Sequence, residues 1–228
     1  MKNERQKNLS LFLIVVMMVS ILTLSSCNRR YDAVEVVAEA EKLLKEAEML
    51  NFVYYGGGIE YYDSDEEKGY YRRANDKHLE TLGFSTIEEL KVLTEKTFSK
   101  EYSTLLYTTI LSPMTNDTSL VSAARYYQVY DEKTGEASYI MVYSKFNLML
   151  KDSIEYDYSS LKATGSKKEK VFVTVEATVT REDGKSQKTT VTITLVEEDE
   201  GWRIDNPTYA NYNELKDRYD ELNNKDFK

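Results

Sequence analysis

Residues 171–196 read VFVTVEATVTREDGKSQKTTVTITLV, two runs rich in β-branched residues on either side of a short polar segment. In residues 171–180 and 189–196 the apolar side chains recur at every second position, which is the period of a half-buried strand. Between them lies Asp183-Gly184, a strong hairpin signal, because glycine tolerates the positive φ angle that a tight turn needs. The segment therefore predicts an antiparallel hairpin.

The same period of two extends over the second half of the chain, from about residue 124 onward. Residues 126–130 and 137–143 predict another hairpin, with its turn at residues 131–135, and residues 154–162 form a further alternating run. Residues 201–204 are expected to close the sheet after an acidic turn. A short helix over residues 213–222 is expected to end the chain.

The first half of the chain shows helical periodicity instead. Residues 33–50 predict a strong helix, which Asp32 can cap. Its apolar positions fall at spacings of three and four, at Val36, Val37, Ala40, Leu43, Leu44, Ala47 and Leu50. Two further helices are expected over residues 87–96 and 100–111, with Ser85 or Thr86 capping the first and Ser99 preceding the second.

Between the first two of these helices, the sequence favours strands. Residues 52–62 and 69–73 are rich in tyrosine and arginine, and the acidic run at residues 63–69 reads as the tip of a hairpin. The glycines at residues 56–58 suggest a bulge or bend within the first strand.

Helices therefore come mostly first and antiparallel strands follow, without an alternating βαβ rhythm. This order predicts an α+β fold, with N-terminal helices packed on one face of a curved antiparallel sheet. It resembles the cystatin-like and NTF2-like cone folds. Residues 33–228 are expected to form one domain, which must hold by packing because the chain has a single cysteine.

That cysteine, Cys27, follows a typical export signal. Residues 1–8 carry three basic side chains and one acidic one, and the apolar run at residues 9–24 is shorter than the roughly 20 residues of a membrane-spanning helix. The segment Leu24-Ser25-Ser26-Cys27 resembles the bacterial lipobox, in which the cysteine receives a diacylglyceryl group. Residues 1–26 are thus expected to be a lipoprotein signal peptide and residues 27–32 a lipidated tether. The protein is expected to be extracytoplasmic and anchored to the cell membrane by lipid.

The charge of the mature chain limits its partners. From Cys27 onward, 27 Lys and Arg stand against 38 Asp and Glu, a formal charge of −11. Nucleic acid is not expected as a partner, because there is no basic excess to neutralise phosphates. An acidic surface suits a basic protein partner, although the same charge also simply favours solubility.

The residues that carry most enzyme chemistry are scarce. The one histidine, His78, is expected in an exposed polar loop, and no Gly-x-Ser-x-Gly elbow is present. One histidine and a lipidated cysteine cannot build a usual zinc site, and the acidic run at residues 63–67 lacks the glycine and distal glutamate of a calcium loop. We expect neither an enzyme nor a bound metal or cofactor.

Tyrosine is unusually abundant, with 19 in the chain. Adjacent pairs occur in runs that read as strands, where neighbours point to opposite faces, so that one tyrosine of each pair could serve an interface. The other interpretation is that strands favour tyrosine and both faces are partly covered. The pairs are Tyr54-Tyr55, Tyr61-Tyr62, Tyr70-Tyr71 and Tyr126-Tyr127.

Three segments together resemble a known family. They are STIEEL at residues 85–90 running on to TFSKEY at 97–102, YDEKTGE at 130–136, and GWRIDNPTY at 201–209. In this order they are similar to the exported DL-endopeptidase inhibitors of Gram-positive bacteria, over roughly residues 52–212. The resemblance implies a protein that binds NlpC/P60-type cell-wall hydrolases and occludes their catalytic cleft. Trp202 is expected to pack in the core, and Pro207 to fix the exit from the last strand.

No inhibitory residue can be carried over from the family, so the mechanism is a hypothesis from charge: one of two acidic loops enters the cleft of the endopeptidase. The residues concerned are Asp63, Asp65, Glu66, Glu67, Asp131, Glu132 and Glu136. The alternative is a cone-fold lipoprotein that binds a small ligand or cell-wall fragment in its concavity, in a pocket lined by tyrosines.

Overall fold

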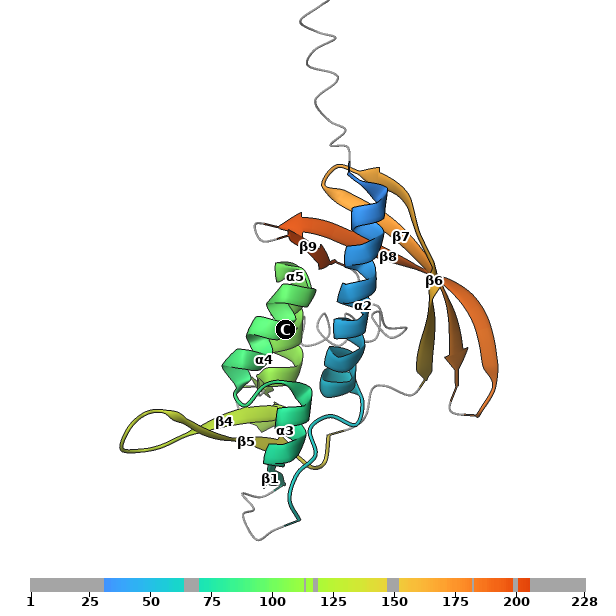
Figure 1. The fold of residues 1–228 in the computed structure, drawn as a ribbon. Coiled ribbons are helices and arrows are strands. Elements are labelled where there is room, and N and C mark those ends of the chain that lie inside the picture. Colours follow the sequence, from blue (N-terminus) through green and yellow to red (C-terminus); the bar gives the residue numbers. More distant parts are fainter. Residues whose placement is uncertain are drawn as a thin grey trace, which may run out of the picture.

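The computed structural model describes residues 31–63, 70–112, 114–116, 119–146, 152–181, 183–198 and 201–205, with only the backbone of 114–116 and 119–122. The fold is α+β, with helices in the first half and antiparallel strands in the second (Figure 1). The helices are α2 (Ala33–Tyr55), α3 (Asp76–Leu82), α4 (Ile87–Thr97) and α5 (Lys100–Leu106), which continues into the π-helical turn η1 (Tyr107–Leu111). The strands are β1 (Tyr71–Arg73), β2 (Met114–Asn116), β3 (Ser119–Ser122), β4 (Tyr126–Tyr130), β5 (Ala137–Tyr143), β6 (Ser153–Lys167), β7 (Lys170–Thr180), β8 (Ser186–Glu198) and β9 (Gly201–Ile204).

The long helix α2 forms the centre of the molecule and packs against β6, β9 and α4 (Figure 1). Its predicted apolar stripe is buried almost throughout, and Asp32 caps it by accepting the Val34 N–H at 2.8 Å. The helices α4 and α5 also begin as predicted. Thr86 and Glu89 form a reciprocal capping box on α4, and Ser99 caps α5.

The prediction of a strand over residues 52–62 is wrong, because α2 continues through Tyr55 and beyond it only Tyr61 makes an isolated bridge, to Ala74. Packing overrides the β preference of tyrosine here. The stripe continues through Val53 and Tyr54, and both tyrosine hydroxyls find buried partners. Tyr54 bonds Thr94 at 2.7 Å, and Tyr55 bonds Tyr102 at 2.9 Å. The glycines at residues 56–58 end the helix instead of bending a strand.

The predicted strands do not form one sheet. They divide into a four-stranded sheet in the order β6-β7-β8-β9, a three-stranded sheet in the order β1-β5-β4, and the pair β2-β3, which the sequence did not predict. The hairpin β7–β8 forms as expected, with Gly184 at φ +78° in its turn. Its buried side chains, including Val173 and Ile193, join the hydrophobic core with those of α2. The strand β6 is longer than predicted and carries two register shifts.

The two halves of the chain are joined where α2 ends. The Tyr126 hydroxyl donates to the Val53 carbonyl at 2.6 Å and accepts the Ile59 N–H at 3.2 Å. The Arg125 Nη2 donates to the Gly56 carbonyl at 2.5 Å, so a buried cation lies at the negative end of the helix. Gly58 has φ +74°, and a Cβ there would lie 2.4 Å from the Tyr126 hydroxyl, so glycine is required. These contacts place the three-stranded sheet at the C-terminal end of α2.

Candidate protein-binding surface

The hairpin β4–β5 carries one of the two predicted acidic loops. Its strands pair from Tyr126↔Val142 to Tyr130↔Ala137, and it extends away from the helices in Figure 1. The pairing of β1 covers only residues 141–143 of β5. Every residue from 130 to 138 is exposed. The end of the hairpin therefore offers its side chains freely to a partner.

The tip, residues 131–136, is a closed turn held by its own hydrogen bonds. One carboxylate oxygen of Asp131 accepts the N–H groups of Lys133 and Thr134, at 2.8 and 2.9 Å. These bonds, first that from Thr134, lower the pKa of Asp131. The Asp131 N–H donates to the Glu136 carbonyl, and the Gly135 N–H to the Asp131 carbonyl. The tip is thus preorganised, which reduces the entropy lost on binding.

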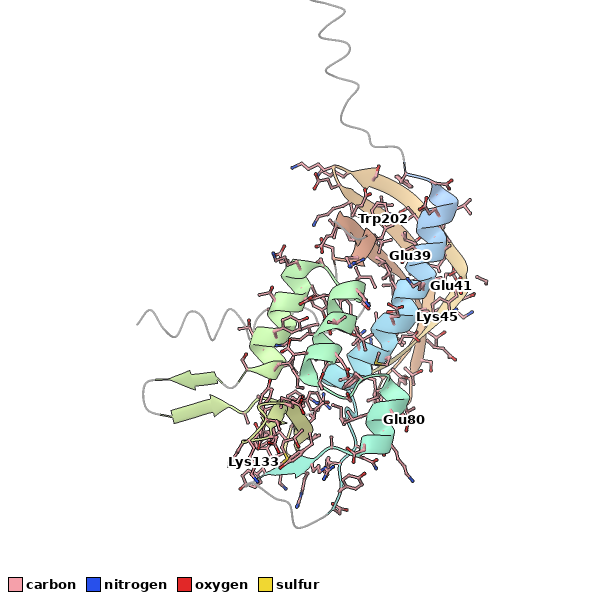
Figure 2. The ribbon with its side chains drawn as sticks, turned by 60° about the vertical axis from the view of Figure 1, so that its left-hand side comes forward. Glu39, Glu41, Lys45, Glu80, Lys133 and Trp202 are labelled. Carbon is pink, nitrogen blue, oxygen red and sulfur yellow. The ribbon has the colours of Figure 1, made fainter. Side chains whose placement is uncertain are left out.

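This geometry separates the roles of the predicted tip residues. The Asp131 carboxylate is engaged in shaping the turn, whereas Glu132 and Glu136 are exposed side chains free to meet a partner. Lys133, labelled in Figure 2, is exposed beside them. Three acids and one lysine give the tip a formal charge of −2, and Tyr130, 54% exposed, lies at its base.

Of the other predicted acidic loop, residues 63–67, the structure describes only Asp63. Asp63 is exposed and follows Tyr62, whose N–H donates to the Arg73 carbonyl. Arg73 pairs with Met141 of β5, whereas the tip begins at Ala137, four residues or about 13 Å along the strand. Asp65, Glu66 and Glu67 lie outside the described residues. A role of this loop in binding therefore stays a prediction.

The outer face of the three-stranded sheet gathers tyrosines. The register places Tyr71, Tyr127, Tyr139 and Tyr143 on the same face, opposite to the side on which Tyr126 is buried. The ring of Tyr71 packs against those of Tyr127 and Tyr143, with centroids 4.8 and 5.1 Å apart. All four are half-buried, and burial raises the pKa values of Tyr71 and Tyr127.

The tyrosine pairs thus behave in two ways. Tyr54-Tyr55 lies on a helix and is wholly buried, contrary to the prediction, whereas Tyr126 and Tyr127 do point to opposite faces of a strand. Arg73 lies over the Tyr139 ring at 5.1 Å on the outer face. Tyrosine and arginine are enriched at protein interfaces, so this face suits the edge of a binding surface.

His78 is not in a loop, as the sequence suggested, but on α3, and it is half-buried. Its Nδ1 accepts the Glu60 N–H at 2.8 Å, so it fastens the segment after α2 to α3. Within the part of the chain that the structure describes, no group of three or more metal-ligating side chains occurs. No local pattern indicates the His78 contact, because Glu60 is 18 residues away.

A small cleft lies at the other end of the molecule, where α2 begins. It has a volume of about 180 Å³, below the roughly 300–1,000 Å³ of usual ligand pockets. Tyr31, Glu35, Lys168 and Trp202 are among the side chains that line it. The prediction that Trp202 packs in the core is confirmed in part, because its side chain is half-buried and packs against the core. Pro207, the helix predicted at residues 213–222 and the proposed lipid site Cys27 lie outside the described residues.

A search of known protein families finds no match to the chain, and no curated protein matches it significantly. Among the described helices, none is both long and apolar enough to cross a membrane.

Proposed function

We propose that this protein is a non-catalytic lipoprotein that binds and inhibits NlpC/P60-type peptidoglycan DL-endopeptidases. Lipid on Cys27 would hold it outside the cell membrane and confine its action to the nearby cell wall. The observation that carries the proposal is the exposed, preorganised acidic tip at residues 131–136, within one of the segments that resemble the inhibitor family. The fold type belongs to the same proposal: the sheet β6–β9, bent around α2, would correspond to the cone of cystatin-like and NTF2-like proteins.

The proposed mechanism is occlusion. Glu132 and Glu136 would pair with basic groups at the rim of the endopeptidase cleft, while the rigid turn blocks access of the stem peptide. Complementary charge speeds association and selects the partner, and a preorganised hairpin loses little entropy when it binds. The tyrosines of the outer sheet face would extend the contact beside the tip.

The alternative of a small ligand in a concavity has less support. The cleft at the start of α2 is small and has Tyr31 as its one tyrosine, and a hollow of about 400 Å³ on α2 is lined by Ala38 and charged side chains without a tyrosine. Tyr54 and Tyr55 are buried in the core with satisfied hydroxyls. We therefore favour the protein-binding function.

The test is complex formation between the soluble chain from Asn28 and a panel of recombinant NlpC/P60 domains. We expect co-elution with the unmodified chain and an affinity at least about tenfold weaker, or about 1.4 kcal/mol, for Glu132→Lys/Glu136→Lys. The matched control is Glu101→Lys/Glu155→Lys, which changes net charge equally at exposed positions on α5 and β6. Equal affinity of both double variants would refute the role of the tip, and no complex with any domain would refute the function.

A further inference from the structure

We propose that His78 is a pH-sensitive latch: the neutral side chain holds the backbone of Glu60 against α3, and the protonated side chain releases it. The latch belongs to the fold itself, so it does not depend on the function proposed above. It gives a role to the one histidine of the chain, which the proposed mechanism of inhibition does not use.

The hydrogen bond at His78 requires a neutral imidazole. The Glu60 N–H donates to His78 Nδ1 at 2.8 Å, so this nitrogen must offer its lone pair and the ring proton must lie on Nε2. In an imidazolium both ring nitrogens carry protons, and neither can accept a hydrogen bond. Protonation of His78 therefore removes the acceptor and sets two N–H groups against each other.

The helix α3 binds both backbone polar groups of Glu60. His78 accepts the Glu60 N–H, and the Asn75 N–H donates to the Glu60 carbonyl at 2.8 Å. Asn75 is itself fixed, because its side chain caps α3 by accepting the N–H groups of Lys77 and His78. Loss of the acceptor on His78 removes one of these two contacts, and Glu60 is then held less firmly.

The contacts on either side of Glu60 do not respond to mild acid. The Ile59 N–H donates to the Tyr126 hydroxyl at 3.2 Å, and burial raises the pKa of Tyr126 to about 12. The Tyr62 N–H donates to the Arg73 carbonyl at 3.0 Å. Neither acceptor changes its charge between about pH 5.5 and 7.5, so the effect of protonating His78 is centred on the chain between these two contacts.

Charged groups lie on both sides of His78, on α3 and on the segment that faces it. The Asp76 carboxylate is engaged by Arg73 Nη2 at 3.2 Å and by the Tyr62 hydroxyl at 3.5 Å. The exposed charged side chains nearby in the sequence and on the facing segment are Glu60, Lys77 and Glu80, the last labelled in Figure 2. Carboxylates, lysine, arginine and tyrosine ordinarily change charge outside the range from pH 5 to 8, whereas histidine changes charge within it. A change at Glu60 over this range is therefore assigned to His78.

The latch affects the surface that follows it in the chain. Tyr61 and Tyr62 come directly after Glu60 and are 38% and 36% exposed, and Asp63 begins the second predicted acidic loop. When Glu60 is released, the chain between Ile59 and Tyr62 gains conformational freedom. Mild acid would therefore make this surface less preorganised for a partner.

The test is nuclear magnetic resonance of the ¹⁵N-labelled chain from Asn28, which contains every residue of the described fold. At pH 7.5 we expect the ring proton of His78 on Nε2 and none on Nδ1. Between pH 7.5 and 5.5, the protection of the Glu60 amide against hydrogen exchange should fall about tenfold after correction for the intrinsic exchange rate. The reference is the Leu90 amide, which donates to the Thr86 carbonyl at 3.1 Å in the first turn of α4 and should keep its protection.

Two variants separate the acceptor from the charge. In His78→Asn, the side-chain oxygen can accept the Glu60 N–H but takes up no proton, so the protection of Glu60 should be equal at both pH values. In His78→Phe no acceptor remains, so the Glu60 amide should exchange at both pH values as fast as it does in the unmodified chain at pH 5.5.

Three results would overturn the latch. The first is a proton on His78 Nδ1 at pH 7.5, and the second is equal protection of Glu60 at pH 7.5 and 5.5 in the unmodified chain, a measurement that needs no variant to fold. The third is the same pH-dependent loss of protection in His78→Asn. Endopeptidase binding is measured separately at pH 7.5, where the latch is closed, so that failure of the proposed function is distinct from failure of the latch.

Discussion

The hydroxyl of Tyr126 closes the end of α2, and the substitution Tyr126→Phe removes that hydroxyl while keeping the ring. The side chain is 1% exposed, and the hydroxyl serves the Val53 carbonyl and the Ile59 N–H at once. A buried polar group left without a partner costs about 1–3 kcal/mol. Phenylalanine leaves only the volume of one oxygen atom at this buried position, which is less than a water molecule needs. We therefore expect a loss of about 2–3 kcal/mol in the free energy of unfolding.

The assay is urea unfolding followed by the fluorescence of Trp202 and by circular dichroism. With a slope of about 2 kcal/mol/M, the midpoint should fall by about 1–1.5 M while the slope itself stays constant. The control is Tyr130→Phe on the same strand, whose side chain is 54% exposed and should change stability by less than about 0.5 kcal/mol. A loss of similar size in both variants, or a loss under about 0.5 kcal/mol for Tyr126→Phe, would refute the argument that this hydroxyl closes the helix.

Three further predictions concern pH, a helix cap and the tip. Burial raises the pKa of Tyr126 to about 12 and raises those of Tyr54 and Tyr55 as well, while unfolded tyrosines ionise near pH 10. Above pH 10 the folded state therefore binds more protons than the unfolded state. The stability that these tyrosines contribute should be fully present below pH 10 and be lost between pH 10 and 12, less steeply in Tyr126→Phe. Urea midpoints that stay constant from pH 8 to 11.5 would contradict this. Thr86→Ala removes the capping box of α4 and should lower stability by about 1 kcal/mol, seen as a drop of roughly 2–4 °C in the melting temperature, and an unaltered melting temperature would argue against the cap. Asp131→Ala leaves Glu132 and Glu136 in place but removes the acceptor of the Lys133 and Thr134 N–H groups. Hydrogen exchange of the Lys133 and Thr134 amides should therefore speed up, and endopeptidase binding should weaken. Unchanged exchange would show that the carboxylate does not hold the turn.

The sequence predicted local structure well where a pattern and a cap coincide. The apolar stripe and Asp32 located the start of α2, and the alternating runs around Asp183-Gly184 located β7 and β8. In each case, neighbouring residues in the sequence contain the whole signal, because helices and tight hairpins are made from local contacts.

The errors arose where distant residues decide the structure. Tyr54 and Tyr55 read as a strand, but hydroxyl partners from α4 and α5, 40 and 47 residues away, extend the helix through them. Alternation also cannot tell which strands pair, so the division into separate sheets was not visible. For the same reason the sequence could not show that Tyr62, beside Asp63, bonds Arg73 of β1, which pairs with Met141, four residues from the start of the tip at Ala137.

The turn that carries the candidate site was predicted from the sequence, whereas its role in binding stays a prediction. The sequence identified Asp131, Glu132 and Glu136 as a charged turn, and the structure divides them into one carboxylate that shapes the turn and two that face outward. That division depends on backbone geometry, which residue type alone does not specify. The tyrosine face beside the tip likewise appeared only once the register of β1, β4 and β5 was known.

The central claim is inhibition, and the most direct measurement is a titration of catalytic activity. A purified NlpC/P60 endopeptidase at fixed concentration cleaves a defined stem-peptide substrate while the soluble chain from Asn28 is added in steps. The account predicts a steady fall in rate that reaches its minimum near one equivalent of protein. Full activity at several equivalents, for every endopeptidase of a representative panel, would contradict it.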